Sequence, residues 1–224
     1  MRVLALETST LAGGVALVDG ERLVAEYLLD VSVTHSERLM GTVDRVLADA
    51  RWAPHDLQGI AVSIGPGSFT GLRVGVSAAK GLALALGVPI AAVPTLDAMA
   101  AAVPWPALAV CPVLTARRDE VYACLYRHDG AGVRREWEYL ALPPADVAAR
   151  LTEPTLVIGD GAGAIDSPYA RRLPPPHRLP SPACVATFGR ERLRLGEGVG
   201  AAELTPLYLR PSQAELRRRA ATVR

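Results

Sequence analysis

The amino-acid sequence predicts an α/β protein made of two similar lobes, because the same order of elements occurs twice along the chain. Each half of the 224 residues contains patterns for three strands, a helix, a further strand and a second helix. Hairpin turn signals lie at matching places, Asp19-Gly20 and Asp129-Gly130, since type I′ turns need residues that tolerate positive φ. Glycine-rich loops at residues 65–67 and 159–161 match as well. We therefore expect a duplicated lobe.

The first half begins with three expected strands and continues to two helices. The run from Thr34 to Glu37 has the form of a capping box, in which a hydroxyl and a carboxylate satisfy free backbone N–H groups of a helix. Apolar residues then recur at helical spacing up to Ala50. The expected strands are residues 2–7, 14–19, 22–29, 59–64 and 88–93, and the expected helices span residues 34–50 and 71–86.

A break in composition at residues 103–106, Val-Pro-Trp-Pro, separates the halves. We expect an N-terminal lobe of residues 1–103 and a C-terminal lobe of residues 104–224 that ends in a basic tail. The second half should hold strands at residues 108–114, 121–127, 133–140 and 155–158, with helices at 145–151 and 183–195. This order is that of an RNase H-like lobe. Two such lobes facing each other form the architecture of actin, sugar kinases and Hsp70 chaperones, the ASKHA superfamily.

Composition excludes several other classes of protein. The 24 Lys and Arg residues against 23 Asp and Glu residues give a net charge of +1, which provides no global attraction to nucleic acid or to an anionic membrane. Lys80 and several glycines interrupt the longest apolar run, so we expect no membrane span. The chain starts directly with a strand pattern rather than a signal peptide, and its three cysteines are widely spaced. We expect a cytoplasmic protein without disulfides.

The end of the first strand carries a polar run, Glu7, Thr8, Ser9 and Thr10, where the superfamily places a phosphate-contacting hairpin. Its counterpart in the second half is the loop that contains Gly159, Asp160 and Gly161. If the lobes form a cleft, these two loops should face each other across it. The negative charge of Glu7 would repel phosphates, so we expect weak or vestigial nucleotide binding. The alternative is an ordinary polar hairpin.

The glycine-rich loop of residues 65–71 leads into the second helix. It suits close approach of a ligand or of another chain, and the helix N-terminus after it offers free N–H groups. The alternative is a tight strand-to-helix turn. It does not fit the P-loop pattern or the nucleophile elbow, so Ser68 is not expected to be a catalytic serine. The four histidines are scattered and form no helix-spaced pair, so we expect no metal site.

Small residues recur on one stripe of the second helix: Gly71, Gly75, Ala78 and Leu82. Such a stripe lets another helix approach closely, either inside the lobe or in a second subunit. Leu39, Met40 and Val43 of the preceding helix could supply apolar area beside it. We expect these two helices of the N-terminal lobe to carry a partner surface.

Five segments together resemble the bacterial TsaB family, also known as YeaZ. They are LALETST at residues 4–10, GPGSFTGLRVG at 65–75, AKGLA at 79–83, ARRDEVY at 116–122 and PLYLR at 206–210. The resemblance spans residues 3 to 210, and the glycine-rich loop is its most specific segment. The catalytic paralogue family, TsaD, shares the features of the first half but lacks the RDEVY segment.

This resemblance implies a role in making threonylcarbamoyladenosine in tRNA, at the adenosine next to the anticodon. TsaD transfers the threonylcarbamoyl group, TsaB is a non-catalytic partner required for the transfer, and an ATPase, TsaE, joins the complex. The resemblance also implies a homodimer when the transferase is absent, and contact with tRNA through the complex. No cofactor is expected in this chain alone, and any ATP or ADP is expected in the complex.

One departure from the TsaD pattern concerns the metal. The two histidines of the TsaD metal pair correspond to Thr95 and Met99 here, and neither side chain can replace an imidazole ligand. We therefore expect no metal and no catalytic residue. The rival interpretation is a stand-alone ATPase or kinase, in which Asp160 would be the acidic partner of Glu7. The arginines at 217–219 indicate either a solvated tail or an RNA contact.

Overall fold

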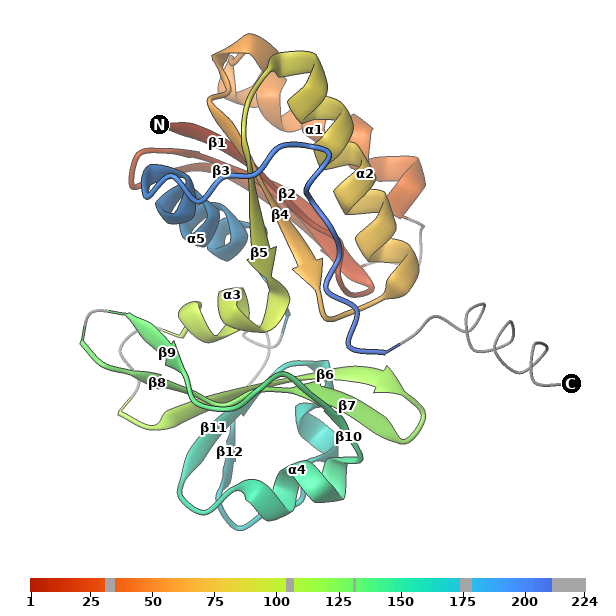
Figure 1. The fold of residues 1–224 in the computed structure, drawn as a ribbon, viewed down its shortest axis with the longest axis vertical. Coiled ribbons are helices and arrows are strands. Elements are labelled where there is room, and N and C mark those ends of the chain that lie inside the picture. Colours follow the sequence, from red (N-terminus) through yellow and green to blue (C-terminus); the bar gives the residue numbers. More distant parts are fainter. Residues whose placement is uncertain (31–34, 104–106, 131, 174–178, 211–224) are drawn as a thin grey trace, which may run out of the picture.

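The computed structural model places two β-sheets one above the other with helix α3 (Thr95–Ala101) between them (Figure 1). It describes residues 1–30, 35–103, 107–130, 132–173 and 179–210. The first residue of the expected capping box, Thr34, the Pro-Trp-Pro run at 104–106 and the basic tail with its arginines at 217–219 lie outside the described residues.

The first sheet has five strands in the order β3-β2-β1-β4-β5. Strand β1 pairs antiparallel with β2 and parallel with β4, so it lies at the centre of the sheet. Side chains alternate along it: Leu4 and Leu6 belong to the core on one face, and Val3 and Ala5 to the core on the other. The strands are β1 (Arg2–Glu7), β2 (Ala12–Asp19), β3 (Arg22–Asp30), β4 (Gly59–Gly65) and β5 (Ile90–Pro94).

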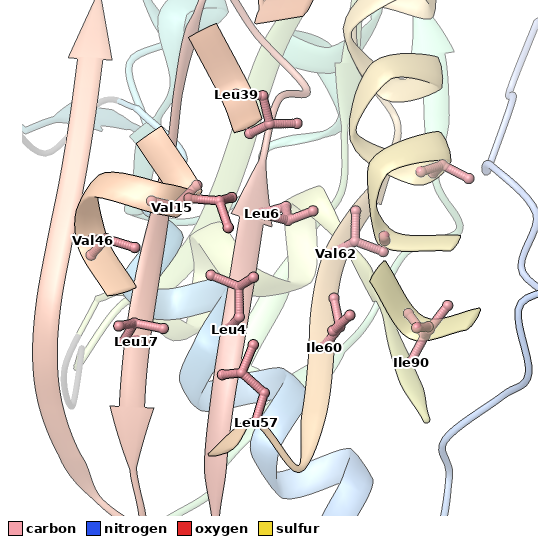
Figure 2. Packing of buried hydrophobic residues seen from close by; sticks show 14 of the residues in the cluster. Leu4, Leu6, Val15, Leu17, Leu39, Val46, Leu57, Ile60, Val62 and Ile90 are labelled. Carbon is pink, nitrogen blue, oxygen red and sulfur yellow. The ribbon is translucent and has the colours of Figure 1, made fainter. Parts of the chain in front are cut away.

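Two helices, α1 (His35–Ala50) and α2 (Phe69–Leu86), cover one face of this sheet, and the short helix η1 (Pro54–Asp56) precedes β4. Figure 2 shows Leu39 and Val46 of α1 beside the strand side chains Val15 and Leu6. Both helices end near the expected positions, and α2 stops at Gly87 in the left-handed conformation. For α1, the helical spacing of apolar residues thus predicted which face is buried.

Helix α2 contradicts one expectation about membranes. Its 18 residues, with a mean hydropathy of 1.2, are long and apolar enough by length and composition to cross a bilayer despite Lys80. In this fold α2 packs on β4, and Leu72, Val76 and Ala79 are buried there. The helix therefore serves as a core helix of the first lobe.

The opposite face of the first sheet is covered by helix α5 (Pro182–Arg194), which comes from the far end of the chain. Val185 and Ala186 pack against the small residues of β1, β2 and β4. The Glu26 carboxylate on β3 accepts hydrogen bonds from the Ser181 hydroxyl at 2.6 Å and from the Ala183 N–H at 3.0 Å. Helix α5 and Leu204 thus belong to the first lobe, unlike the expected C-terminal lobe of residues 104–224, because α5 covers an apolar face of the first sheet.

The second sheet has the order β10-β7-β6-β11-β12, and β8 pairs with β6 and β9. The expected strand at 121–127 is split into β7 and β8, because the chain turns at residues 124–125, where the Leu125 carbonyl accepts from the Glu136 and Trp137 N–H groups. The elements are β6 (Ala109–Arg117), β7 (Glu120–Ala123), β8 (Tyr126–His128), β9 (Val133–Arg135), β10 (Leu140–Leu142), α4 (Pro144–Arg150), β11 (Thr155–Ile158), η2 (Asp160–Ala164) and β12 (Ala170–Arg172).

The contact between α5 and the first sheet predicts that replacing glycine by alanine has opposite effects on stability at Gly41 and Gly189. A Cβ at Gly189 would lie 2.3 Å from the Cβ of Ala61, whereas a Cβ at Gly41 on α1 meets no atom within 4 Å. Gly41→Ala should raise the free energy of unfolding by up to about 1 kcal/mol through helix propensity. Gly189→Ala should lower it by about 1–3 kcal/mol through overpacking. Urea unfolding measures both, and equal effects would contradict this packing.

Candidate functional site

A cleft of about 520 Å³ lies between the two lobes. The first lobe contributes the turn between β1 and β2 and the N-terminal end of α2, and the second lobe contributes the end of β6. The chain's last described segment forms a further wall. The lining residues are Ser9, Thr10, Leu11, Pro66, Gly67, Ser68, Phe69, Leu114, Thr115, Ala116, Arg117, Tyr122, Asp160, Leu207, Tyr208, Leu209 and Arg210.

The polar run after β1 forms a tight turn whose hydroxyl groups donate inside the protein. The carboxylate of Glu7 is fully buried, and its Oε1 accepts from the Ser9 N–H at 2.6 Å and from the Ser9 hydroxyl at 2.5 Å. The Thr8 hydroxyl donates to the Gly71 carbonyl at 2.8 Å, and the Thr10 hydroxyl to the Ala12 carbonyl at 2.9 Å. These donors are therefore engaged within the lobe rather than directed at a ligand.

The glycine-rich loop receives this turn. The Ser68 N–H donates to the Ser9 carbonyl at 2.6 Å, and a Cβ at Gly67 would lie only 2.2 Å from that carbonyl oxygen. A Cβ at Gly75 would lie 2.3 Å from the Thr8 Oγ1. The space beside Gly67 is therefore filled by the chain's own turn after β1, and not by a ligand or another chain.

The small-residue stripe on α2 is therefore not a partner surface at Gly71 and Gly75. Both residues are buried against the turn of residues 7–10, because backbone and hydroxyl atoms need the space that a side chain would fill. Leu39 and Val43 on α1 are also buried, in the core of the first lobe. These four residues face inward, contrary to their expected role.

The outer faces of α1 and α2 carry different residues. Met40 is 44% exposed and Leu84 is 75% exposed, while Ala78 and Leu82 are half-buried at the edge. Glycines with no atom of the lobe within 4 Å of a Cβ stand on both helices, Gly41 on α1 and Gly81 on α2. This outer face is apolar in part and open to close approach.

The loop of the second lobe places one of its three expected residues in the cleft. Asp160 lines the cleft, and its Oδ1 accepts from the Thr115 N–H at 2.9 Å. Gly159 has φ of 107°, and a Cβ there would lie 2.0 Å from the Val113 carbonyl oxygen, while Gly161 packs on Val113. The cleft thus brings Ser9, Thr10 and Asp160 together, whereas Glu7, Thr8, Gly159 and Gly161 lie behind its wall.

Among the residues that the structure describes, no group of three or more His, Cys, Asp or Glu side chains lies close enough to hold a metal ion. Thr95 and Met99, the positions that depart from the TsaD pattern, are buried on α3.

One part of the cleft rim was not expected from the residues alone. The Tyr208 and Phe69 rings contact each other at a centroid distance of 4.9 Å. The Arg73 guanidinium lies over the Phe69 ring, 4.5 Å from its centroid. Arg210 forms an ion pair with Glu120 at 2.5 Å. The sequence did contain a signal for this part of the rim, because two segments that carry the family resemblance, PLYLR and ARRDEVY, meet here.

A family model described as TsaD: tRNA N6-adenosine threonylcarbamoyltransferase matches residues 30–160, more than half of the chain. The solved structure of YeaZ from Pseudomonas aeruginosa matches with a TM-score of 0.82 and 30% identity, over 93% of this chain and 99% of that one. The chain belongs to the TsaB (YeaZ) family. Its recognition from five sequence segments is confirmed.

Curated TsaB relatives match over a shorter stretch. The tRNA threonylcarbamoyladenosine biosynthesis protein TsaB of Bacillus subtilis is 41% identical over 128 residues, 57% of this chain and 56% of the relative. TsaB of Escherichia coli is 36% identical over 136 residues, 59% and 58% of the two chains. The chain thus spans about half the length of these relatives in the matches. An activator of 2-hydroxyisocaproyl-CoA dehydratase from Clostridium difficile, at 9% identity and a TM-score of 0.53, shares the two-lobed fold alone.

The packing of the turn of residues 7–10 against α2 predicts that substitutions at Thr8 and Gly75 have coupled effects on the free energy of unfolding. Gly75→Ala should lower the free energy of unfolding by about 1–3 kcal/mol, because the added Cβ collides with the Thr8 Oγ1. Thr8→Ala removes that oxygen and leaves atoms at ordinary contact distance. The double variant should therefore be more stable than the sum of the single effects predicts. Additive effects in denaturant unfolding would show that Gly75 does not hold the turn.

Proposed function

We propose that this chain is a non-catalytic subunit required for threonylcarbamoylation of the adenosine next to the anticodon in tRNA, and that it binds and activates a TsaD-like transferase. The names of the TsaB relatives support the pathway. The observation that carries the non-catalytic role is the turn after β1. Ser9 N–H and hydroxyl groups that would hold a phosphate both donate to Glu7 instead.

A stand-alone ATPase or kinase is not favoured. Such an enzyme would need free donors and an acidic pair in the cleft, whereas Glu7 lies behind the cleft wall and Asp160 accepts from Thr115. Any functional nucleotide is therefore held by the transferase or at the interface with it. A TsaE-like ATPase joins the assembly, tRNA is reached through the complex, and the chain works in the cytoplasm.

The partner surface of this proposal is the outer face of α1 and α2, defined by Met40, Gly41, Ser77, Gly81 and Leu84. A glycine in an exposed helix costs about 1 kcal/mol relative to alanine, and no atom of the lobe requires one at Gly81. A partner helix that approaches the backbone closely would account for it. The exposed Leu84 and Met40 supply apolar area, so the same face supports homodimers when the transferase is absent.

Reconstituted modification tests the proposed function directly. A TsaD-like transferase with the TsaE-like ATPase, tRNA and threonylcarbamoyl-adenylate should form threonylcarbamoyladenosine only when this chain is added. The chain alone, given the same tRNA and adenylate, should form none. Product from the chain without a transferase, or full product from the transferase without the chain, would contradict the proposal.

Substitution on the outer face tests the partner surface. Gly81→Leu places a bulky side chain where no atom of the lobe lies, so the chain should fold normally and bind the transferase at least about tenfold more weakly. Leu84→Arg should act in the same way. The matched control is Leu195→Arg, since Leu195 is 58% exposed at the end of α5. Unchanged binding and self-association of Gly81→Leu and Leu84→Arg in analytical ultracentrifugation would exclude this surface.

Calorimetry with ATP and magnesium tests the closed turn. The chain alone should bind ATP with a dissociation constant of about 1 mM or weaker, because its donors are engaged internally. A micromolar constant that is lost in the Glu7→Gln variant would show an active nucleotide site and would favour the ATPase interpretation.

A further inference from the structure

On one side of the cleft, the lobes are joined by a buried contact through α3. Leu96 and Met99 pack against Val110 and Leu114 of the second sheet in one shared core. The helix follows β5 without a linker and also contacts α5, so it is fixed to the first lobe.

A polar cluster adds to this buried contact. The Asp97 Oδ1 accepts from the Tyr126 hydroxyl at 2.6 Å and from the Tyr139 hydroxyl at 2.8 Å. Burial, together with the charge of Asp97, raises the pKa of both tyrosines, so they remain protonated donors. This side of the interface has the character of a protein interior.

On the other side, the segment 204–210 crosses from the first lobe to the second. Leu204 is buried in the core of the first lobe, and the Leu207 N–H donates to the Ile64 carbonyl at 2.7 Å. The Arg210 guanidinium then reaches the second lobe, where it contacts Glu120 at 2.5 Å and the Ala141 carbonyl at 3.2 Å. Figure 1 shows this segment and α3 on opposite sides of the space between the lobes.

The two connections differ in strength. The Arg210 side chain is 43% exposed and that of Glu120 is 24% exposed, so salt and water weaken their ion pair. An exposed ion pair changes an equilibrium by at most about five-fold. Salt does not weaken the buried contact around Leu96 and Met99 in this way, since breaking that contact exposes apolar surface to water.

We propose that α3 is a pivot between the lobes and that the segment 204–210 is a latch, which closes the cleft through the contacts of Arg210 with Glu120 and the Ala141 carbonyl and opens it when those contacts break. The latch residues Tyr208 and Arg210 themselves line the cleft, as do Ser9 and Asp160. Opening therefore changes both the width of the cleft and its wall. The inference is independent of the proposed function, because it concerns motion within this chain.

Distances between two spin labels test the latch. Labels are attached at His55→Cys on η1 and Ala149→Cys on α4, both exposed, in a Cys184→Ser background. The other two cysteines are buried, and burial raises the pKa of Cys111 to about 12 and that of Cys124 to about 11, which keeps them unreactive. Labelled chain is diluted with unlabelled chain, so that only distances within one molecule are measured by pulsed electron paramagnetic resonance.

Arg210→Ala and Glu120→Gln should each increase a longer-distance population by up to about five-fold, and added salt should do the same in the unsubstituted chain. Arg194→Ala breaks an exposed ion pair within α5 and should leave the distances unchanged. Melting temperatures verify that all variants fold. Identical distance distributions in Arg210→Ala and the unsubstituted chain, at low and high salt, would overturn the proposal.

Discussion

The structure depends on the packing of one buried polar turn against two glycines, Gly67 and Gly75. The carboxyl group of Glu7 is fully removed from water, and a buried polar group is tolerated only when it has hydrogen-bond partners. Ser9 provides two of them, which forces the chain after β1 into a tight turn. That turn fits only because Gly67 and Gly75 leave its backbone and hydroxyl atoms room. Two of the five segments that carry the resemblance therefore form one packed unit, on which the position of α2 and the cleft wall depend.

The second constraint is that a five-stranded sheet in the middle of a lobe needs a cover on both faces. The first half of the chain provides α1 and α2 for one face, and the other face is covered by α5 from the end of the chain. This return brings residues 204–210 back across the cleft to Glu120. As a result, two segments that are about 90 residues apart in sequence meet at the rim, and the lobes are connected on both sides.

Sequence periodicity predicted the features that depend on packing between neighbouring elements. Helical spacing along α1 indicated the correct buried face, because that face packs on the neighbouring sheet. Helix α3 was missed because it has seven residues, of which five are buried, so no amphipathic period exists. The destination of α5 could not be predicted, since an apolar stripe does not show which sheet it covers. Small residues at Gly71 and Gly75 likewise do not indicate whether a partner or the chain's own turn fills the space.

The internally bonded turn after β1 holds the first lobe together in this member of the TsaB family. Hydrogen exchange of the Ser9 and Ser68 amides, resolved by NMR with and without ATP and magnesium, measures this most directly. Both N–H groups donate within the lobe, so they should exchange about as slowly as the core strands, with rates unchanged by ATP. Fast exchange that slows when ATP is added would show that these donors serve a nucleotide, and would contradict the account.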